Sequence, residues 1–269
     1  MAVSLIITTY NWEKALEACL RSAFRQTRTV REIIVADDGS RPATRELIDR
    51  MRAESPTALI HVWHEDQGFR AAAIRNKAIA AAGGDYIILA DGDVILERHF
   101  VEDHCDAAEP GFFVQGGRVI IGSRRTSRIL DFGHTRLHPF SWGIFNRKNT
   151  IRSKLLSKLT FSETSSFKGI RTCNFAFWRA DGIVVNGFNE AFVGWGREDT
   201  EFATRLHNSG VHRRNLRYRA LAYHLYHREN SRKFLDKNVQ LLAQTQKLGM
   251  KWCEKGLDQH LLHENKILV

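Results

Sequence analysis

Residues 86–93 read YIILADGD, an apolar run that ends in two aspartates, Asp91 and Asp93, with one glycine between them. A short, continuous apolar run is typical of a strand that is buried on both faces of a parallel sheet. In open parallel sheets, ligands bind outside the carboxyl ends of the strands. The two aspartates therefore stand at a position suited to binding.

Two earlier segments have the same form. Residues 3–8, VSLIIT, run into Thr8 and Tyr10, and residues 32–36, EIIVA, run into Asp38. The carboxyl ends of parallel strands meet at one edge of a sheet, so we expect these polar side chains to lie beside the aspartate pair.

Helical segments alternate with these strands. Residues 13–25 and 44–52 have apolar residues at helical spacing, residues 70–82 are rich in alanine, and residues 60–63 predict one more short strand. This alternation predicts an α/β fold, Rossmann-like, with a mostly parallel sheet, right-handed crossovers and flanking helices.

The remainder of the chain is less regular. Residues 111–171 are basic and poor in long apolar runs, and they predict strands at 112–114 and 119–121 followed by a long excursion. A helix is expected at residues 198–209. Residues 232–268 again have apolar residues at helical spacing, which predicts a helical C-terminal extension.

Positive charge is concentrated in the middle of the chain. The formal net charge is +10, and ten Lys or Arg but only one acid, Asp131, fall within residues 111–160. This stretch is either a solvated face or a surface for phosphorylated glycans, anionic lipid headgroups or nucleic acid. We expect no nucleic-acid partner, because the sequence has no recognisable nucleic-acid motif and no basic residues interleaved with stacking aromatics.

The four cysteines are far apart in the sequence and form no CxxC pair, which favours a reducing compartment. The N-terminus has no basic region or cleavage site of a signal peptide. No window holds 18 apolar residues without charge, so no membrane-spanning segment is expected. We therefore expect a cytoplasmic protein that contacts the inner face of the membrane through its basic residues.

The aspartates at the predicted strand ends indicate specific chemistry. Asp91 and Asp93 could share a Mn²⁺ or Mg²⁺ ion that also binds a substrate diphosphate, although a solvated turn is the alternative. Asp38 could accept a hydrogen bond from the imide of uracil. The alternative there is an ordinary turn, since Asp-Gly is a common turn pair.

One arginine and two histidines could act together with these acids. Arg75, on the predicted helix before residues 86–93, suits bidentate phosphate binding, unless it is a surface arginine. His224 and His227 follow a short apolar run and could supply a metal ligand. On a strand the two histidines would face opposite sides, so we expect at most one to bind the metal.

The segment GWGREDTE, residues 194–201, is dense in functional residue types. Two glycines bracket Trp195, which leaves an indole face free to lie against a sugar ring. The acids Glu198 and Asp199 open a predicted helix, where the helix dipole favours negative charge. Capping is therefore one interpretation, and a general base for an acceptor hydroxyl is the other.

Together these motifs resemble family 2 glycosyltransferases of the GT-A fold. Residues 187–199 look like the acceptor-side motif of β1,4-galactosyltransferases and of enzymes of the bacterial chondroitin-polymerase type. The resemblance covers about residues 3–103 and 172–227, whereas residues 111–171 and the tail match no motif. Residues 196–201 differ from the run of acids in the galactosyltransferases, so the donor sugar stays open.

On the donor side, the resemblance implies a UDP-sugar and a Mn²⁺ or Mg²⁺ ion. It assigns Thr8, Tyr10 and Asp38 to the uridine. Arg75 is assigned to the diphosphate region, and Asp91 to the ribose or the metal.

At the reacting centre, the resemblance implies Asp93 as the direct metal ligand, completed by His227 or, less favoured, His224. Asp199 is the implied catalytic base. Such enzymes invert the anomeric carbon by a single displacement, which needs one base and no nucleophile from the enzyme. The acceptor pocket is assigned to Gly194, Trp195 and Glu198.

The expected function is transfer of a hexose or N-acetylhexosamine to a hydroxyl of a glycan or lipid-linked glycan, in bacterial lipopolysaccharide, capsule or other surface polysaccharide synthesis. The expected catalytic domain is residues 1–230, with a nucleotide-sugar half at 1–110 and an acceptor half at 111–230, followed by the extension at 231–269. The alternatives are a nucleotidylyltransferase, disfavoured because no glycine-rich loop follows the first strand, and a non-catalytic carbohydrate-binding module.

Overall fold

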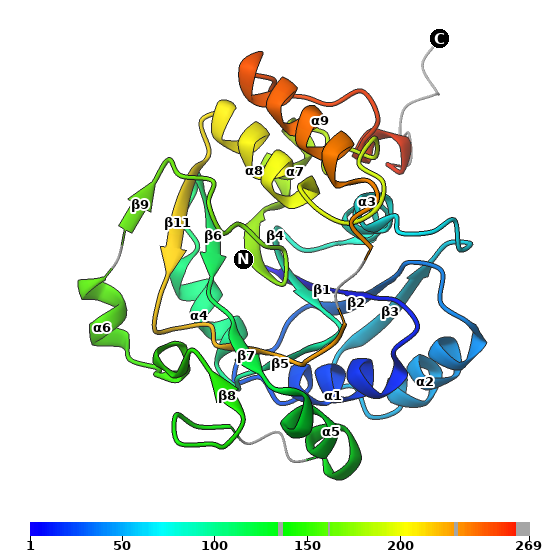
Figure 1. The fold of residues 1–269 in the computed structure, drawn as a ribbon, viewed down its shortest axis with the longest axis vertical. Coiled ribbons are helices and arrows are strands. Elements are labelled where there is room, and N and C mark those ends of the chain that lie inside the picture. Colours follow the sequence, from blue (N-terminus) through cyan, green and yellow to red (C-terminus); the bar gives the residue numbers. More distant parts are fainter. Residues whose placement is uncertain (134–136, 161, 229–230, 262–269) are drawn as a thin grey trace.

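The computed structural model describes residues 1–133, 137–160, 162–228 and 231–261 (Figure 1). Its larger sheet has eight strands, in the order β3 (Ala58–Trp63), β2 (Glu32–Asp37), β1 (Val3–Thr9), β4 (Tyr86–Asp91), β10 (Asn174–Trp178), β6 (Phe112–Gly116), β11 (His212–Leu216) and β9 (Ser162–Thr164). Strands β3, β2, β1 and β4 are parallel to one another, whereas β10 is antiparallel to both β4 and β6. The mostly parallel α/β sheet expected from the sequence is confirmed.

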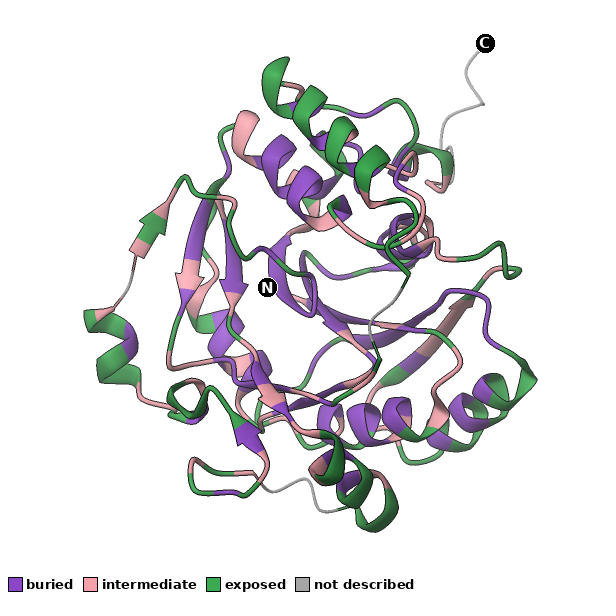
Figure 2. Cartoon of the chain, in the orientation of Figure 1, coloured by how far each residue is buried: buried purple, intermediate pink, exposed green. Residues whose placement is uncertain are grey.

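Helices cover both faces of this sheet. Alternate residues of β1 point to opposite faces, so Leu5 packs with α1 (Glu13–Ala23) and α2 (Pro42–Arg52). Ile6 packs on the other face, in the cluster that includes residues of α3 (Ala71–Ala81) and α8 (Glu198–Asn208), and α7 (Arg179–Val184) contacts β10. Figure 2 shows the strands of the centre as largely buried. Burial on both faces explains why the strand sequences are continuous apolar runs.

A second, smaller sheet lies beside the first. It has the order β5 (Val94–Leu96), β12 (Ala222–His224), β7 (Val119–Ile121) and β8 (Ile144–Phe145). Strand β5 follows Asp93 directly and pairs with β12, so the sheet brings the chain near residue 224 back to the aspartate pair. This long-range pairing is what positions the histidines of the site.

The middle of the chain is more ordered than its sequence indicated. Strands β6 and β7 confirm the two expected strands, but the following residues are not a continuous excursion. They form α5 (Ser123–Phe132), β8, a 3₁₀ turn at Arg147–Thr150, α6 (Lys154–Leu159) and β9. In α5 only Thr126 and Ile129 are buried, so the helix has too few apolar residues to be recognised from its sequence.

The tail is helical only in part. Helix α9 (Leu235–Lys247) packs on α8, and a short 3₁₀ turn follows at Leu257–Gln259. The expectation of helix up to residue 268 is therefore wrong for residues 248–256, and residues 262–268 lie outside the described part of the chain. Among the described residues, no helix is long and apolar enough to cross a membrane.

Candidate active site

The ends of three strands meet at one edge of the large sheet, as the sequence predicted. Thr8 of β1 lies opposite Asp91 of β4, and Thr9 lies opposite Asp37 of β2. The register therefore places the ends of β1, β2 and β4 along one edge of the sheet (Figure 1). We call this edge, which carries Thr8, Asp38 and Asp91, the rim. The rim is one part of the candidate site.

Asp38 on the rim is held by two donors. Its Oδ1 lies 2.7 Å from Nε2 of His64, and its Oδ2 accepts a hydrogen bond of 2.9 Å from the backbone N–H of Arg70. The carboxylate is buried, so these contacts fix its orientation. His64 was not expected from the sequence, and the one signal for it is its place directly after the short strand β3.

Tyr10 is half-exposed, and its hydroxyl donates to Oδ2 of Asp66 at 2.9 Å. The next residue, Asn11, has a left-handed backbone with φ of 45° and joins the loops after β1 and β2: its N–H donates to Ser40, and its side-chain oxygen accepts from the N–H of Arg41. An exposed aromatic ring beside a fixed turn is a suitable platform for a planar base.

Arg75 is not a surface arginine. It is buried, with 4% of its surface exposed, and its guanidinium donates to Glu198 Oε1 at 3.1 Å and lies 3.5 Å from Asp91 Oδ1. Its Nε also reaches the hydroxyl of Thr8 at 3.3 Å. Arg75 thus joins the rim to the first turn of α8, and in this structure its charge is directed at carboxylates.

A three-residue cluster forms the centre of the site. Nitrogen atoms of His224 and His227 and an oxygen of Asp93 lie within 4.8 Å of one another. Nε2 of His227 lies 3.2 Å, and Nε2 of His224 3.7 Å, from the same oxygen, Asp93 Oδ2. The expectation that strand alternation would separate the histidines is wrong, because β12 ends at His224 and residues 225–227 do not continue the strand.

The chemistry of this cluster fits a divalent cation. The carbonyl of Arg228 can only accept a hydrogen bond, so Nδ1 of His227, at 2.7 Å, is the donor. In neutral imidazole this leaves a lone pair on Nε2, which faces Asp93 Oδ2. Two acceptors at 3.2 Å need a proton or a cation between them. Asp93 Oδ1 is also buried without a partner among the described residues.

The charges of the cluster are set mainly by burial. Burial raises the pKa of Asp93 to about 6, while the nearby His227 lowers it in part. Burial lowers the pKa of His224 to about 4, and the charge of Arg118 adds to this shift. Near neutral pH, His224 is therefore uncharged, which is the form that binds metals.

Asp199 lies in the first turn of α8 beside Glu198. Its Oδ1 accepts from the backbone N–H of Thr200 at 2.6 Å and from the Thr200 hydroxyl at 3.2 Å. Burial and the neighbouring Glu198 raise the pKa of Asp199 to about 7, against the opposing effect of Arg75. A carboxylate with this pKa is suited to accept a proton at neutral pH.

The loop before α8 has an unusual backbone. Gly194, Gly196 and Arg197 all have left-handed φ values, of 74°, 106° and 78°. Trp195 between them is 40% exposed, and the guanidinium of Arg232 lies 5.7 Å from the centre of its ring. Two of these three positions are glycine, the residue that adopts such angles without strain.

Helix α9 holds this loop in place. The side-chain amide of Asn238 donates to the carbonyls of Val193 at 3.2 Å and Gly196 at 2.9 Å, and Asn238 is fully buried. Phe234, at the start of α9, fills the space beside Gly194. The sequence carried no signal for this support, because an asparagine in a polar helix is not distinctive.

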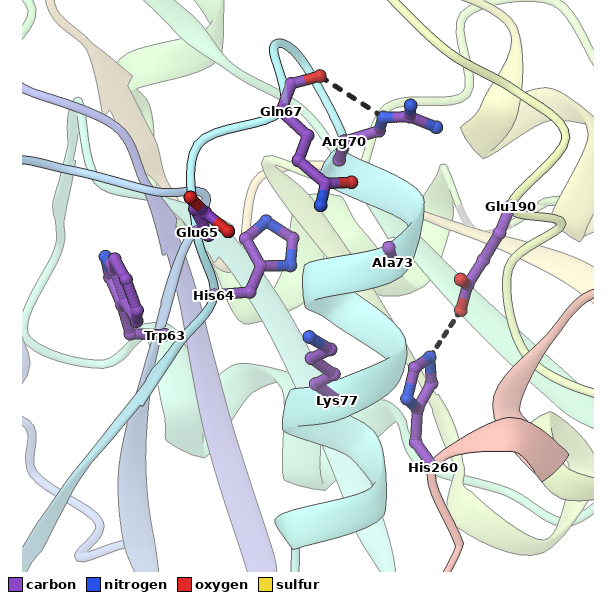
Figure 3. Close-up of a pocket in the computed structure, with 9 residues that line it drawn as sticks. All are labelled: Trp63, His64, Glu65, Gln67, Arg70, Ala73, Lys77, Glu190 and His260. Carbon is purple, nitrogen blue, oxygen red and sulfur yellow. Dashed lines mark hydrogen bonds and ion pairs between the residues drawn. The ribbon is translucent and has the colours of Figure 1, made fainter.

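A separate hollow of about 460 Å³ lies on the outer side of α3, between that helix and the chain after β3 (Figure 3). His64 and Lys77 line it, and on its far side His260 is bonded to Glu190 at 2.7 Å. His64 links the hollow to Asp38. Neither Asp199 nor the cluster of Asp93, His224 and His227 lines the hollow, so it is separate from the candidate metal site.

Comparisons with known proteins agree with this geometry. A model of glycosyl transferase family 2 matches residues 4–173, and a model described as the N-terminal domain of galactosyltransferase matches residues 156–228. The matched residues include 111–171, which carry no motif that is recognisable by itself. They also include the rim and, in the second match, the loop before α8.

Two curated relatives cover most of the chain. Chondroitin synthase of Escherichia coli is 28% identical over 240 residues, which are 82% of this chain and 34% of the relative. Validoxylamine A glucosyltransferase of Streptomyces hygroscopicus subsp. jinggangensis is 27% identical over 241 residues, which are 78% of this chain and 52% of the relative. The chain spans about a third to a half of the length of these proteins.

Solved structures confirm the GT-A fold. TarS 1-349 of S. aureus in complex with UDP superimposes with a TM-score of 0.64 at 18% identity, covering 97% of this chain and 70% of that one. A mannosyltransferase of Pyrobaculum calidifontis in complex with GDP-Man and Mn²⁺ gives a TM-score of 0.56 at 19% identity, covering 84% and 57%. Since the family model matches 170 of the 269 residues (4–173), the chain belongs to glycosyltransferase family 2.

Proposed function

We propose that the protein is an inverting glycosyltransferase that moves a hexose or N-acetylhexosamine from a UDP-sugar to a hydroxyl of a glycan acceptor. The observation that carries the proposal is the joint arrangement of two features. The Asp93, His224 and His227 cluster lies beside the rim, and Arg75 ties that rim to the helix turn that holds Asp199. The two curated relatives are named as a chondroitin synthase and a glucosyltransferase, which supports a role in surface polysaccharide synthesis.

For the donor, we assign the uridine to Thr8, Tyr10 and Asp38. The half-exposed ring of Tyr10 is available to the base, and Asp38 is oriented by His64 and Arg70. The UDP complex of TarS supports this choice of nucleotide. Arg75 is assigned to the diphosphate end of the rim, where its positive charge offsets part of the negative charge of the donor.

For the metal, we propose Mn²⁺ or Mg²⁺ held by Asp93 and the two histidines, with Asp91 as a contact to the ribose or the metal. The ion, when bound, stabilises charge on the departing diphosphate. His227 is favoured as a ligand because its Nδ1–H is already donated to a carbonyl, which directs the Nε2 lone pair at Asp93. The Mn²⁺ complex of the mannosyltransferase supports this assignment.

For the transfer step, we propose that Asp199 accepts the proton of the attacking acceptor hydroxyl. One base and no enzymic nucleophile are enough for a single displacement with inversion. Thr200 fixes one oxygen of Asp199 and leaves the other for the acceptor. Gly194 and Trp195 form an exposed loop suited to a sugar ring, and Glu198 positions Arg75.

We also propose that the protein contacts an anionic membrane surface while acting on a lipid-linked glycan. Four aromatic side chains among the described residues in the middle of the chain are strongly exposed: Phe132 (67%), Phe140 (84%), Trp142 (54%) and Phe145 (62%). Exposed aromatics among Lys and Arg are typical of interfacial surfaces. Failure to co-sediment with phosphatidylglycerol vesicles at low salt would remove this part of the proposal.

The central test is UDP release from a panel of UDP-sugars, with Mn²⁺ and with a chelator. We expect metal-dependent release from one donor, strongly reduced in Asp93→Ala. The matched control is Asp49→Ala, which removes an exposed carboxylate of α2 that pairs only with Arg52 among the described residues. Absence of release and of metal-dependent UDP binding in the wild type would refute the proposed function.

A further inference from the structure

A cavity of about 740 Å³ lies between the carboxyl ends of β6 and β11 and the segments 146–149 and 164–171. We call it the basic cleft. Seven of its lining residues are Lys or Arg, and among the described residues no carboxylate lines it. One of the seven, Arg219, is bound to Asp103 and Asp106. Six others have no ion pair in the described part of the chain: Arg118, Lys148, Lys168, Arg171, Arg213 and Arg217.

Arg213 makes the cleft more than a charged surface. It is buried, with 7% of its surface exposed, and its Nη1 donates only to the carbonyls of Ser166 at 2.6 Å and Lys168 at 2.9 Å. Its Nε has no hydrogen-bond partner among the described residues. Burial alone accounts for the lowered pKa of this guanidinium. A buried cation without a counter-charge is costly, and an anion in the cleft would remove that cost.

The loop that forms one wall of the cleft is fixed in a strained shape. Tyr218 and Ala220 have left-handed φ values of 58° and 47°, which non-glycine residues rarely adopt. The fully buried Asp103 holds this loop, because it accepts from Nε of Arg219 at 2.8 Å and from the N–H of Ala220 at 2.9 Å. The wall is therefore organised before any ligand arrives.

The cleft opens beside the reacting centre. Arg118 and Ile120 line the cleft, at the start of β7, and Ile120 pairs with His224 of β12 in the smaller sheet. Cys173 also lines the cleft, and the next residue, Asn174 of β10, pairs with Ala90, which directly precedes Asp91. A ligand in the cleft would thus lie next to the bond that the enzyme makes.

We propose that the basic cleft binds a phosphate-bearing group of the acceptor, so that the acceptor is a phosphorylated glycan and not a neutral one. The six cations that have no ion pair among the described residues exceed what one carboxylate can neutralise, and they suit a group with several negative charges, such as a diphosphate or successive phosphodiesters. Arginine forks bind phosphate oxygens in pairs, and four of the six cations are arginines. The identity of the ligand as an acceptor rests on the proposed function, but phosphate binding by the cleft does not.

The test is a calorimetric titration of metal-free protein, in EDTA, with inorganic pyrophosphate. Arg171→Gln with Arg217→Gln removes two exposed cleft cations. The control is Arg45→Gln with Arg50→Gln, two exposed arginines of α2 that lie away from β6 and β11 (Figure 1). We expect the control to bind as the wild type does and the cleft variant to bind roughly tenfold more weakly or worse. Equal affinity of both variants would overturn the proposal.

Further probes separate the sources of negative charge. Glucuronate, a carboxylate, should bind at least about tenfold more weakly than pyrophosphate if phosphate is the ligand. Equal binding of glucuronate would overturn the phosphate assignment. Tight binding of a single-stranded RNA would overturn it as well, if the cleft variant loses RNA binding more than pyrophosphate binding. The single variant Lys168→Gln, at an exposed side chain, gives the same comparison if the double variant is unstable.

The same protein distinguishes this inference from the proposed function. If the wild type releases UDP in a metal-dependent way but does not bind pyrophosphate, phosphate binding by the basic cleft is refuted and the proposed glycosyl transfer still stands. Pyrophosphate binding that depends on the cleft, without UDP release from any donor, would refute glycosyl transfer and leave an anion site.

Discussion

The rim and the loop before α8 reach their geometry in different ways. On the rim, the side chains follow neighbouring strands, and the sheet register alone brings Thr8 opposite Asp91. The loop at residues 193–197 has three residues with a left-handed backbone, and Asn238 of α9 holds it through a hydrogen bond. Glu198, which follows the loop directly, is bound by Arg75 of α3. The geometry of the rim therefore follows from the sheet itself, whereas the loop before α8 depends on contacts from segments far away in the sequence.

The largest effect should come from Asp199, the proposed base for the acceptor hydroxyl. Asp199→Asn keeps the size of the side chain and removes its ability to take a proton. We expect the rate of transfer to fall by about 10²–10⁴-fold while UDP-sugar binding stays nearly unchanged. Steady-state kinetics and calorimetry with the same donor measure both, and normal turnover would remove Asp199 from this role.

The pH dependence provides the control for this prediction. Burial beside Glu198 raises the pKa of Asp199 to about 7, so the base is protonated and inactive below that pH. The rate should rise about tenfold per pH unit below 7 and level off above it. The residual rate of Asp199→Asn should lack this acid limb, and a wild-type rate that is constant from pH 5 to 8 would contradict the assignment.

The next effect concerns the residue that joins the two regions. Arg75→Met removes a buried guanidinium and leaves Glu198 and Asp91 without their cation. We expect a loss of about 3–5 kcal/mol in the free energy of unfolding, measured with urea. Arg45→Met on the exposed face of α2 is the control and should stay within about 0.5 kcal/mol.

A comparison within the metal cluster is expected to show a smaller change. His227→Ala removes the ligand whose Nε2 lies 3.2 Å from Asp93, and His224→Ala removes the one at 3.7 Å. We expect His227→Ala to weaken Mn²⁺ binding by about 10–100-fold, and His224→Ala to weaken it less. Titration of Mn²⁺ by electron paramagnetic resonance gives both constants, and the reverse order would exchange the two roles.

The smallest effect should come from α9. Asn238→Ala deletes the donor to the carbonyls of Val193 and Gly196, at a cost of about 1–3 kcal/mol in stability. We expect a higher KM for the acceptor with little change in UDP release without acceptor. Gln240→Ala, exposed on the same helix, is the control. An unchanged acceptor KM in Asn238→Ala would mean that the loop does not need this support.

Much of the rim could be predicted because its signals are local. The apolar runs that became β1, β2 and β4 each end at the polar residues assigned to the donor, and strand ends of a parallel sheet meet by geometry. The missed contributors share a different property. His64 and Asn238 act on partners 26 and 42 or more residues away, at positions where no periodicity marks them.

By itself the sequence determined the fold class, the rim and the first turn of α8, because continuous apolar runs, helical spacing and the order of strands and helices are properties of neighbouring residues. Only the tertiary structure decided that Arg75 is buried between carboxylates, that both histidines face Asp93, and that one cleft gathers six cations without an ion pair among the described residues. These facts depend on which distant segments the sheets bring together. Desolvation then gives the gathered charges the pKa values that the chemistry needs.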